Sequence, residues 1–210
     1  IRNPTLLVIL IHKTMQSDAF NIWSLFMSLF NLQQVVVPSL VDYHPYWKHG
    51  ERNPARNSDT YKIMDLKSPD EKGHKAAVAY FGNLLNTEVQ RLLQTWNTNT
   101  IQVAIVPSSK VGKQSIGLEA VLEHVKGANL LYNSSFLNRF ESIPAAHEGG
   151  ERNTQNHFNS IAVSTIPNPD IPLLLLDDVT TTGSSMDACV QLLRQAGVKQ
   201  VHMLALGRTV

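Results

Sequence analysis

A pair of carboxylates followed by a hydroxyl-rich turn is the most chemically specific feature of this 210-residue sequence. Asp177 and Asp178 come directly after the apolar run Leu173–Leu176, and the turn that follows ends in Thr-Thr-Gly-Ser-Ser at 181–185. Carboxylates accept hydrogen bonds from vicinal hydroxyls and can hold Mg²⁺ through water. Hydroxyls and backbone N–H groups at the start of a helix suit a phosphate monoester. Together these groups indicate a site for a ribose 5-phosphate.

Alternating apolar strands and amphipathic helices are expected to position this site. The expected strands are 101–106, 129–132, 173–176 and 201–206, and the expected helices are 74–96, 115–125 and a segment that ends near 196. A turn over 177–183 leads into the last helix, which Ser184 or Ser185 is expected to cap. Continuous apolar strands joined by helices are typical of a parallel sheet, so the fold class is α/β. In such sheets ligands bind outside the carboxyl ends of the strands, where the acidic pair lies.

The order of apolar strand, two acidic residues and Thr-Thr-Gly-Ser turn resembles the signature of the type I phosphoribosyltransferases. The resemblance implies a Rossmann-like parallel-sheet fold with an N-terminal cap or hood. It implies that Asp177 and Asp178 hold the ribose hydroxyls of phosphoribosyl pyrophosphate (PRPP), with Mg²⁺ bound to them through water. It implies that the 5-phosphate is cradled by Thr181, Thr182, Gly183, Ser184 and Ser185, and that Val179 and Thr180 also bind PRPP. In the hypoxanthine-type enzymes an Asp stands where this chain has Thr181, which argues against that branch.

Two further stretches agree with the resemblance. The loop after strand 101–106 carries Ser108, Ser109 and Lys110, which resemble the pyrophosphate loop of the family. The aperiodic stretch 133–159 is expected to be a long loop or hairpin, and the family places its flexible catalytic loop there. Arg139 and Arg152 are therefore the candidates to close over the pyrophosphate.

The segments around Arg152 and Leu206–Thr209 resemble ComF-like phosphoribosyltransferases. Those proteins usually begin with a cysteine-rich zinc module, whereas this chain has one cysteine, so the subfamily stays open. Cys189 lies on the apolar side of its expected helix, and we expect it to be a small core residue.

The amino-terminal part differs in composition from the body of the chain. Residues 19–41 carry no charge, and their aromatic residues recur at helical spacing among polar residues, which excludes a membrane-spanning helix. We expect residues 1–60 to form a helical and loop segment that serves as a hood or a homodimer contact. Residues 61–210 are expected to form the phosphoribosyltransferase core. Tyr43, Tyr46 and Trp47 are candidates to contribute to an acceptor site.

Composition limits the classes of partner. The chain holds 18 Lys and Arg against 17 Asp and Glu, a formal net charge of +1, which gives no support to a nucleic-acid-binding protein. With 43% hydrophobic residues the chain can bury a core, so disorder is excluded. A single cysteine excludes an internal disulfide framework and fits a cytoplasmic protein. No membrane partner is expected.

The sequence thus predicts a PRPP-dependent transferase in which a nucleobase or amine displaces pyrophosphate at the anomeric carbon with the help of Mg²⁺. Its partners would be PRPP and a small-molecule acceptor. Two alternatives stay open: a regulator that senses PRPP without turning it over, and a competence-type accessory protein whose partner surface is the apolar stretch 6–41.

Overall fold

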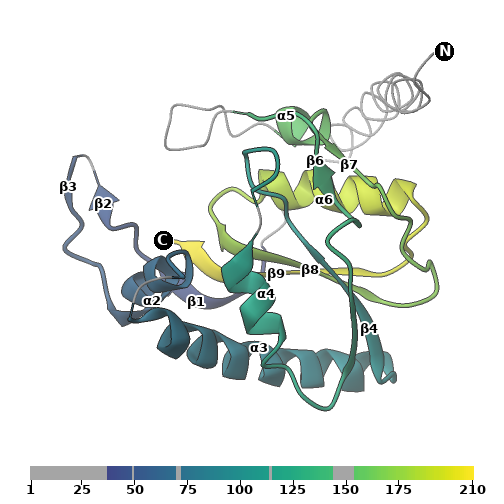
Figure 1. Ribbon diagram of the computed structural model, residues 1–210, viewed down its shortest axis with the longest axis horizontal. Helices are drawn as coiled ribbons and strands as arrows, with labels where there is room; N and C mark the ends of the chain where they lie inside the picture. Colours follow the sequence, from purple (N-terminus) through teal and green to yellow (C-terminus); the bar gives the residue numbers. More distant parts are fainter. Residues whose placement is uncertain (1–36, 49, 70–71, 114, 144–153) are drawn as a thin grey trace.

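A five-stranded parallel sheet forms the centre of the chain in a computed structural model, which describes residues 37–48, 50–69, 72–113, 115–143 and 154–210 (Figure 1). The strand order is β1 (Ser39–Tyr43), β9 (Val201–Thr209), β8 (Leu173–Thr180), β4 (Thr100–Ile105) and β5 (Asn129–Tyr132). Every pairing within this sheet is parallel. The predicted Rossmann-like α/β fold is confirmed.

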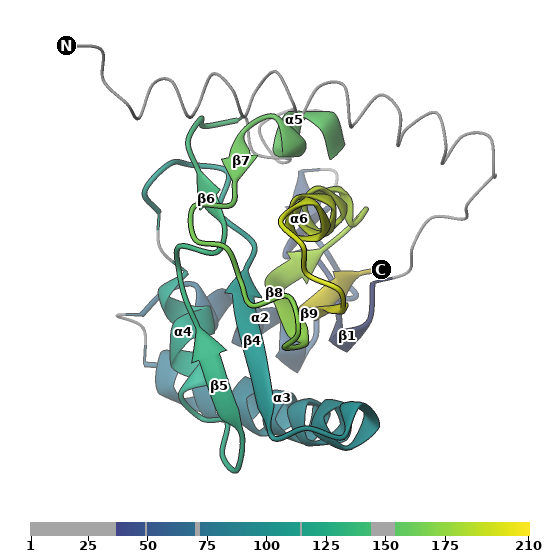
Figure 2. The same ribbon diagram turned by 90° about the vertical axis from the view of Figure 1, so that its right-hand side faces the viewer.

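Helices cover both faces of the sheet (Figure 2). One face packs against α2 (Ser58–Leu66), α3 (His74–Trp96) and α4 (Ile116–Leu122), and the other against α5 (Thr154–Phe158) and α6 (Ser184–Gln195). Two short antiparallel strand pairs complete the described elements: the hairpin of β2 (Trp47–Lys48) with β3 (Glu51–Arg52), and the pair of β6 (Asn138–Arg139) with β7 (Ile161–Ala162).

The four leucines of β8 show why the sheet needs cover on both sides. Leu174 and Leu176 belong to the core on the α3 side, whereas Leu173 and Leu175 belong to the core on the α6 side. All four are fully buried. Because successive side chains of a strand point to opposite faces, an uninterrupted apolar run is stable only between two helical layers.

The predicted elements agree with the structure in type, and three details of the last βαβ unit are corrected. The strand predicted over 201–206 continues to Thr209. The strand predicted over 173–176 continues to Thr180, because Asp177 and Thr180 still pair with β9, opposite Ala205 and Arg208. The acidic pair therefore lies on the end of a strand rather than in a turn. The prediction that Ser184 or Ser185 caps α6 is wrong, since Gly183 is the N-cap residue and no side chain caps the helix.

The remaining elements match more closely. The helix 74–96 and the strand 129–132 have the predicted bounds, and β4 is displaced by one residue from 101–106. The helix predicted over 115–125 is shorter, at 116–122. The stretch 133–159 contributes β6 and α5, and Cys189 is buried in the core as expected.

The segment predicted as a hood contributes a strand to the sheet. β1 pairs with β9, Ser39 opposite Ala205 and Tyr43 opposite Thr209, so residues 39–43 belong to the central sheet. The helix and apolar stretch predicted before them lie outside the described residues. Among the described residues, no helix has the length and apolarity needed to cross a membrane.

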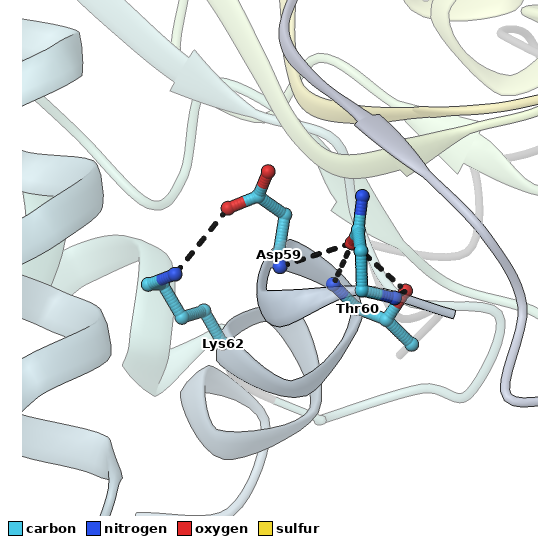
Figure 3. Close-up of polar contacts among 4 residues, drawn as sticks. Asp59, Thr60 and Lys62 are labelled. Atoms are coloured by element: carbon cyan, nitrogen blue, oxygen red, sulfur yellow. Dashed lines mark hydrogen bonds and ion pairs between the residues drawn. The ribbon is translucent and has the colours of Figure 1, made fainter. Parts of the chain in front are cut away.

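A capping box anchors α2, which leads directly into the functional site. The side chain of Asn57 accepts hydrogen bonds from the backbone N–H groups of Asp59 and Thr60, at 3.0 and 3.1 Å. Figure 3 shows these contacts at the first turn, with the ion pair of 3.4 Å between Asp59 and Lys62. Thr60 Oγ1 also donates to the carbonyl oxygen of His44, at 2.9 Å. These bonds tie the start of α2 to the chain that leaves β1.

Replacing Leu175 by alanine tests the importance of the two-sided burial. Leu175→Ala should lower the free energy of unfolding by about 2–5 kcal/mol, because it removes a fully buried side chain and leaves a cavity. Urea unfolding followed by circular dichroism measures the change. Ile166, whose side chain is among the exposed apolar ones at 73%, provides the matched control. An equal loss in Ile166→Ala would contradict the interpretation.

Candidate functional site

The candidate site lies where the chain reverses direction across the sheet. From β4 the chain passes through α4 on one face to β5, at one edge of the sheet. From β8 it passes through α6 on the opposite face to β9, toward the other edge. Since β4 and β8 are neighbours, the loops that leave their carboxyl ends diverge and open a crevice between them.

A cavity of about 640 Å³ fills this crevice. Most of the predicted site residues line it: Ser108, Ser109, Arg139, Asp177, Asp178, Val179, Thr180, Thr181, Thr182, Gly183, Ser184 and Ser185. Lys110 does not line the cavity, whereas Lys113 from the same loop does. Arg152 lies outside the described residues. Two loops that are about 70 residues apart in sequence therefore share one concave surface.

The acidic pair forms one wall of the cavity. Burial raises the pKa of Asp177 well above its usual range, and the charge of Asp178 adds to this effect. The backbone N–H of Asp178 donates to Asp177 Oδ1 at 2.8 Å, which favours the ionised form and opposes the shift. The Asp177 carboxylate is thus ionised at an electrostatic cost, which a cationic or hydroxyl-bearing ligand would reduce.

Lys67 faces the acidic pair and was not among the predicted site residues. Its Nζ lies 2.9 Å from Asp178 Oδ2. Burial lowers the pKa of Lys67, but the carboxylates of Asp178 and Asp177 outweigh burial and raise it above its ordinary value. Lysine in a polar loop carries no distinctive sequence signal, so only the fold relates it to residues more than 100 positions away.

Gly117 allows α2 to bring Lys67 into place. A Cβ atom at position 117 would lie 2.3 Å from the carbonyl oxygen of Leu66, so a side chain there would push the end of α2 away from α4. Both Gly117 and Lys67 line the cavity. The close approach of the two helices therefore sets the position of the ammonium group.

The hydroxyl-rich turn 181–185 also lines the cavity. Gly183 has φ +81°, a left-handed conformation that glycine adopts without strain, and it precedes the first residue of α6. Thr182 Oγ1 and Ser184 Oγ lie 2.9 Å apart, and Thr181 Oγ1 lies 2.9 Å from Thr209 Oγ1. The turn thus gathers hydroxyl groups at the positive end of a 12-residue helix.

Arg139 holds the loop after β4 through hydrogen bonds to its backbone. It is buried, with 6% of its surface exposed, although the sequence suggested a residue of a mobile loop. Its guanidinium donates to the carbonyl oxygens of Ser108 and Pro107 and to Ser160 Oγ. These partners are neutral, so they leave the positive charge of Arg139 at the wall of the cavity.

His157 is a second residue that sequence reasoning missed. It lies on α5, which packs against α6, and it lines the cavity beside the hydroxyl-rich turn. Its Nε2 lies 3.2 Å from Ser185 Oγ, and its Nδ1 lies 3.3 Å from Arg139 Nη2. Its sequence signals were its presence in the aperiodic stretch before β7 and in the segment around Arg152 that carries the ComF-like resemblance.

The aromatic candidates for an acceptor site lie elsewhere. Tyr43, Tyr46 and Trp47 do not line the cavity. Tyr46 and Trp47 pack edge to face at 5.2 Å, and Arg52 and Arg56 lie over the Tyr46 ring. The aromatic cluster therefore belongs to the neighbourhood of the β2–β3 hairpin.

The carboxylates suit a weakly bound, hydrated cation better than a cation whose ligands all come from the protein. Among the described residues, no group of three or more His, Cys, Asp or Glu side chains could hold a metal ion. Asp177 and Asp178 are the two carboxylates among the described residues that line the cavity, and both offer hard oxygen ligands. Mg²⁺ commonly keeps several waters and takes its other ligands from a bound phosphate, so the donor set fits that mode of binding.

Comparison with known structures gives low similarity. A hypoxanthine phosphoribosyltransferase from Staphylococcus aureus matches with a TM-score of 0.39 and 12% identity in one crystal form, and 0.37 and 13% in another. Each match covers 61% of this chain and 61% of that protein, less than two thirds of its length. A purine phosphoribosyltransferase from Pyrococcus horikoshii matches with a TM-score of 0.33 and 8% identity, over 81% of this chain and 92% of that one. No family model and no curated protein matches the sequence. Likeness at this level carries no argument about function, which is therefore argued from the site itself.

Asp177→Asn tests whether the acidic pair is held at a cost to stability. The folded protein binds a proton at Asp177 more tightly than the unfolded chain does, so stability falls as pH rises from the ordinary pKa of 3.8 toward the raised pKa of the folded state. Asparagine does not ionise and keeps an oxygen for the N–H of Asp178. The variant should therefore be more stable than the parent at neutral pH, and the difference should disappear below pH 3.8.

Urea midpoints at neutral and acid pH measure this difference. Asp170→Asn is the matched control, because Asp170 pairs with Lys199 at an exposed position. Its effect should stay within about 0.5 kcal/mol at either pH. A less stable Asp177→Asn at neutral pH would show that the carboxylate stabilises the fold instead.

Proposed function

We propose that this protein is a phosphoribosyltransferase that binds PRPP in the cavity between β4 and β8. The observation that carries the proposal is the convergence of two distant segments, 107–109 and 177–185, on one cavity. The first offers hydroxyls, N–H groups and a nearby guanidinium, and the second offers two carboxylates and a cluster of hydroxyls. A ligand with a diol between two phosphate-bearing ends needs carboxylates for the diol, and hydroxyls, N–H groups and positive charge for the phosphates.

The 5-phosphate of PRPP is assigned to the turn 181–185. The hydroxyls of Thr182, Ser184 and Ser185 and the backbone at Gly183 surround the start of α6. The absence of a β-carbon at Gly183 allows a phosphate oxygen to approach the backbone closely. Backbone N–H groups and the helix dipole favour a dianion there without any basic side chain.

The ribose is assigned to the acidic pair. Asp177 and Asp178 would accept hydrogen bonds from the 2- and 3-hydroxyls, and Lys67 would hold Asp178 in place. The same carboxylates would hold Mg²⁺ through water, and the ion would neutralise charge on the pyrophosphate. As positive charge develops on the ribose ring, the carboxylates would stabilise it electrostatically.

The pyrophosphate is assigned to the loop 107–109, which Arg139 supports. In the transfer step, a nitrogen lone pair of a nucleobase or amine forms a bond to the anomeric carbon. The bond from that carbon to the pyrophosphate oxygen breaks, its electron pair stays on the pyrophosphate, and the acceptor nitrogen releases a proton. The protein contributes mainly position and a preorganised electrostatic environment.

Removing the charge of the acidic pair should abolish PRPP binding. The double variant Asp177→Asn/Asp178→Asn should bind PRPP with Mg²⁺ at least about 100-fold more weakly, since two charge-assisted interactions are lost. Isothermal titration calorimetry measures this, with Asp170→Asn as the control of equal charge change per site. Unchanged affinity in the double variant would refute the assigned role of the pair.

Pyrophosphate release distinguishes an enzyme from a sensor. PRPP, Mg²⁺ and the protein are incubated with a panel of nucleobases and amines, and released pyrophosphate is measured. Acceptor-dependent release above that of the double variant is expected. If PRPP binds but no acceptor releases pyrophosphate, the protein is a PRPP-sensing regulator rather than a transferase.

A further inference from the structure

A chain of three polar side chains connects the two loops of the site. Arg139 donates to the carbonyl oxygens of Pro107 and Ser108 on one side, and its Nη2 lies 3.3 Å from His157 Nδ1 on the other. His157 Nε2 lies 3.2 Å from Ser185 Oγ. This series of side-chain contacts thus runs from the loop after β4, through α5, to the first turn of α6.

The direction of each hydrogen bond in this chain follows from the chemistry of the groups. A guanidinium can only donate, so His157 Nδ1 must accept the bond from Arg139. The ring proton of a neutral imidazole then lies on Nε2, which donates to Ser185 Oγ. Because the Ser185 oxygen accepts this bond, its own hydrogen remains free to be donated elsewhere. Within the described part of the chain, the Ser185 hydroxyl has no other hydrogen-bond partner.

The environment keeps the imidazole neutral. Burial and the neighbouring charge of Arg139 lower the pKa of His157 to about 4. Ser160 holds Arg139 close to α5. Its Oγ accepts a hydrogen bond from Arg139 and donates one to the carbonyl oxygen of Asn156 on α5, at 2.6 Å. The guanidinium and the helix that carries His157 are therefore held together independently of any ligand.

We propose that His157 is a positioning residue, which orients the Ser185 hydroxyl as a hydrogen-bond donor to a phosphate group bound at the turn 181–185. Arg139 acts through His157 and sets its tautomer. This inference rests on the proposed function, because the phosphate is taken to be the 5-phosphate of a ribose. It adds a structural link between the two parts of the site, because Arg139 contacts His157 beside the turn 181–185 and also holds the loop 107–109.

The tautomer can be tested without changing the protein. Long-range ¹⁵N–¹H spectra of ¹⁵N-histidine-labelled protein at neutral pH should show His157 with a protonated Nε2 and an unprotonated Nδ1. His157 is assigned by the loss of its signals in His157→Asn. The opposite tautomer, or a mixture of the two, would overturn the proposal.

Two amide variants separate the two ends of the imidazole. In His157→Asn the amide oxygen can take the place of Nδ1 and accept from Arg139, but no group reaches Ser185. In His157→Gln the amide N–H₂ can take the place of Nε2 and donate to Ser185. With ribose 5-phosphate and PRPP as probes, His157→Asn should bind about tenfold more weakly, and His157→Gln should stay within about threefold of the parent.

A double-mutant cycle tests whether His157 acts through Ser185. Ser185→Ala should weaken ribose 5-phosphate binding about tenfold, and adding His157→Asn to it should cause little further loss. His124→Asn, at an exposed histidine outside the cavity, is the matched control and should bind as the parent does. Additive losses would show that His157 does not act through Ser185. Circular dichroism confirms that each variant is folded.

The outcomes also separate this proposal from the proposed function. If the parent binds PRPP and ribose 5-phosphate but His157→Asn binds equally well, the role of His157 is wrong and the function stands. If the parent binds neither ligand, both are wrong.

Discussion

The pairing of β8 between β4 and β9 is the constraint on which the rest of the structure depends. Four leucines buried on alternate faces hold this strand between two helical layers. The register of β8 against β4 and β9 then fixes where the site residues that follow Leu176 lie relative to the sheet. Because the chain leaves β4 and β8 toward opposite edges, the crevice at their carboxyl ends is a consequence of topology. The polar residues of 107–109 and 177–185 line this crevice.

The site combines a costly arrangement of charge with fixed neutral partners. Asp177 and Asp178 are adjacent on a strand end, where burial and the charge of Asp178 raise the pKa of Asp177 and Lys67 opposes that shift. At the turn 181–185, hydroxyl groups and the start of α6 can bind a phosphate without a basic side chain. This division explains how a chain with a net charge of +1 could bind a strongly anionic sugar phosphate.

Arg139 has a different physical role from the one that its position in the sequence suggested. A guanidinium on a mobile loop would approach its ligand from solvent, whereas this one is buried and bonded to backbone carbonyls of the loop after β4. Its contact with His157 links it to the hydroxyl-rich turn, because His157 lies beside Ser185. Two loops that belong to different βαβ connections are thereby held in one relative position.

The sequence by itself determined the local features. Leucine repetition and the apolar periodicity of 74–96 predicted the strand and helix types, because burial on one or two faces leaves a direct mark on residue order. The Asp-Asp and Thr-Thr-Gly-Ser-Ser run predicted one complete loop of the site, since all of its groups are contiguous. The extension of β8 to Thr180 was missed, because polar residues at a strand end look like a turn until the partner strand is known.

Only the tertiary structure decided which distant groups join that loop. Lys67 meets Asp178 because Gly117 lets α2 approach α4, and His157 meets Ser185 because α5 packs on α6. The folded chain also buries Arg139 and places Lys110 outside the cavity. Isolated lysines, histidines and arginines in polar loops have no periodicity or motif, so their partners depend on how helices and sheet pack together.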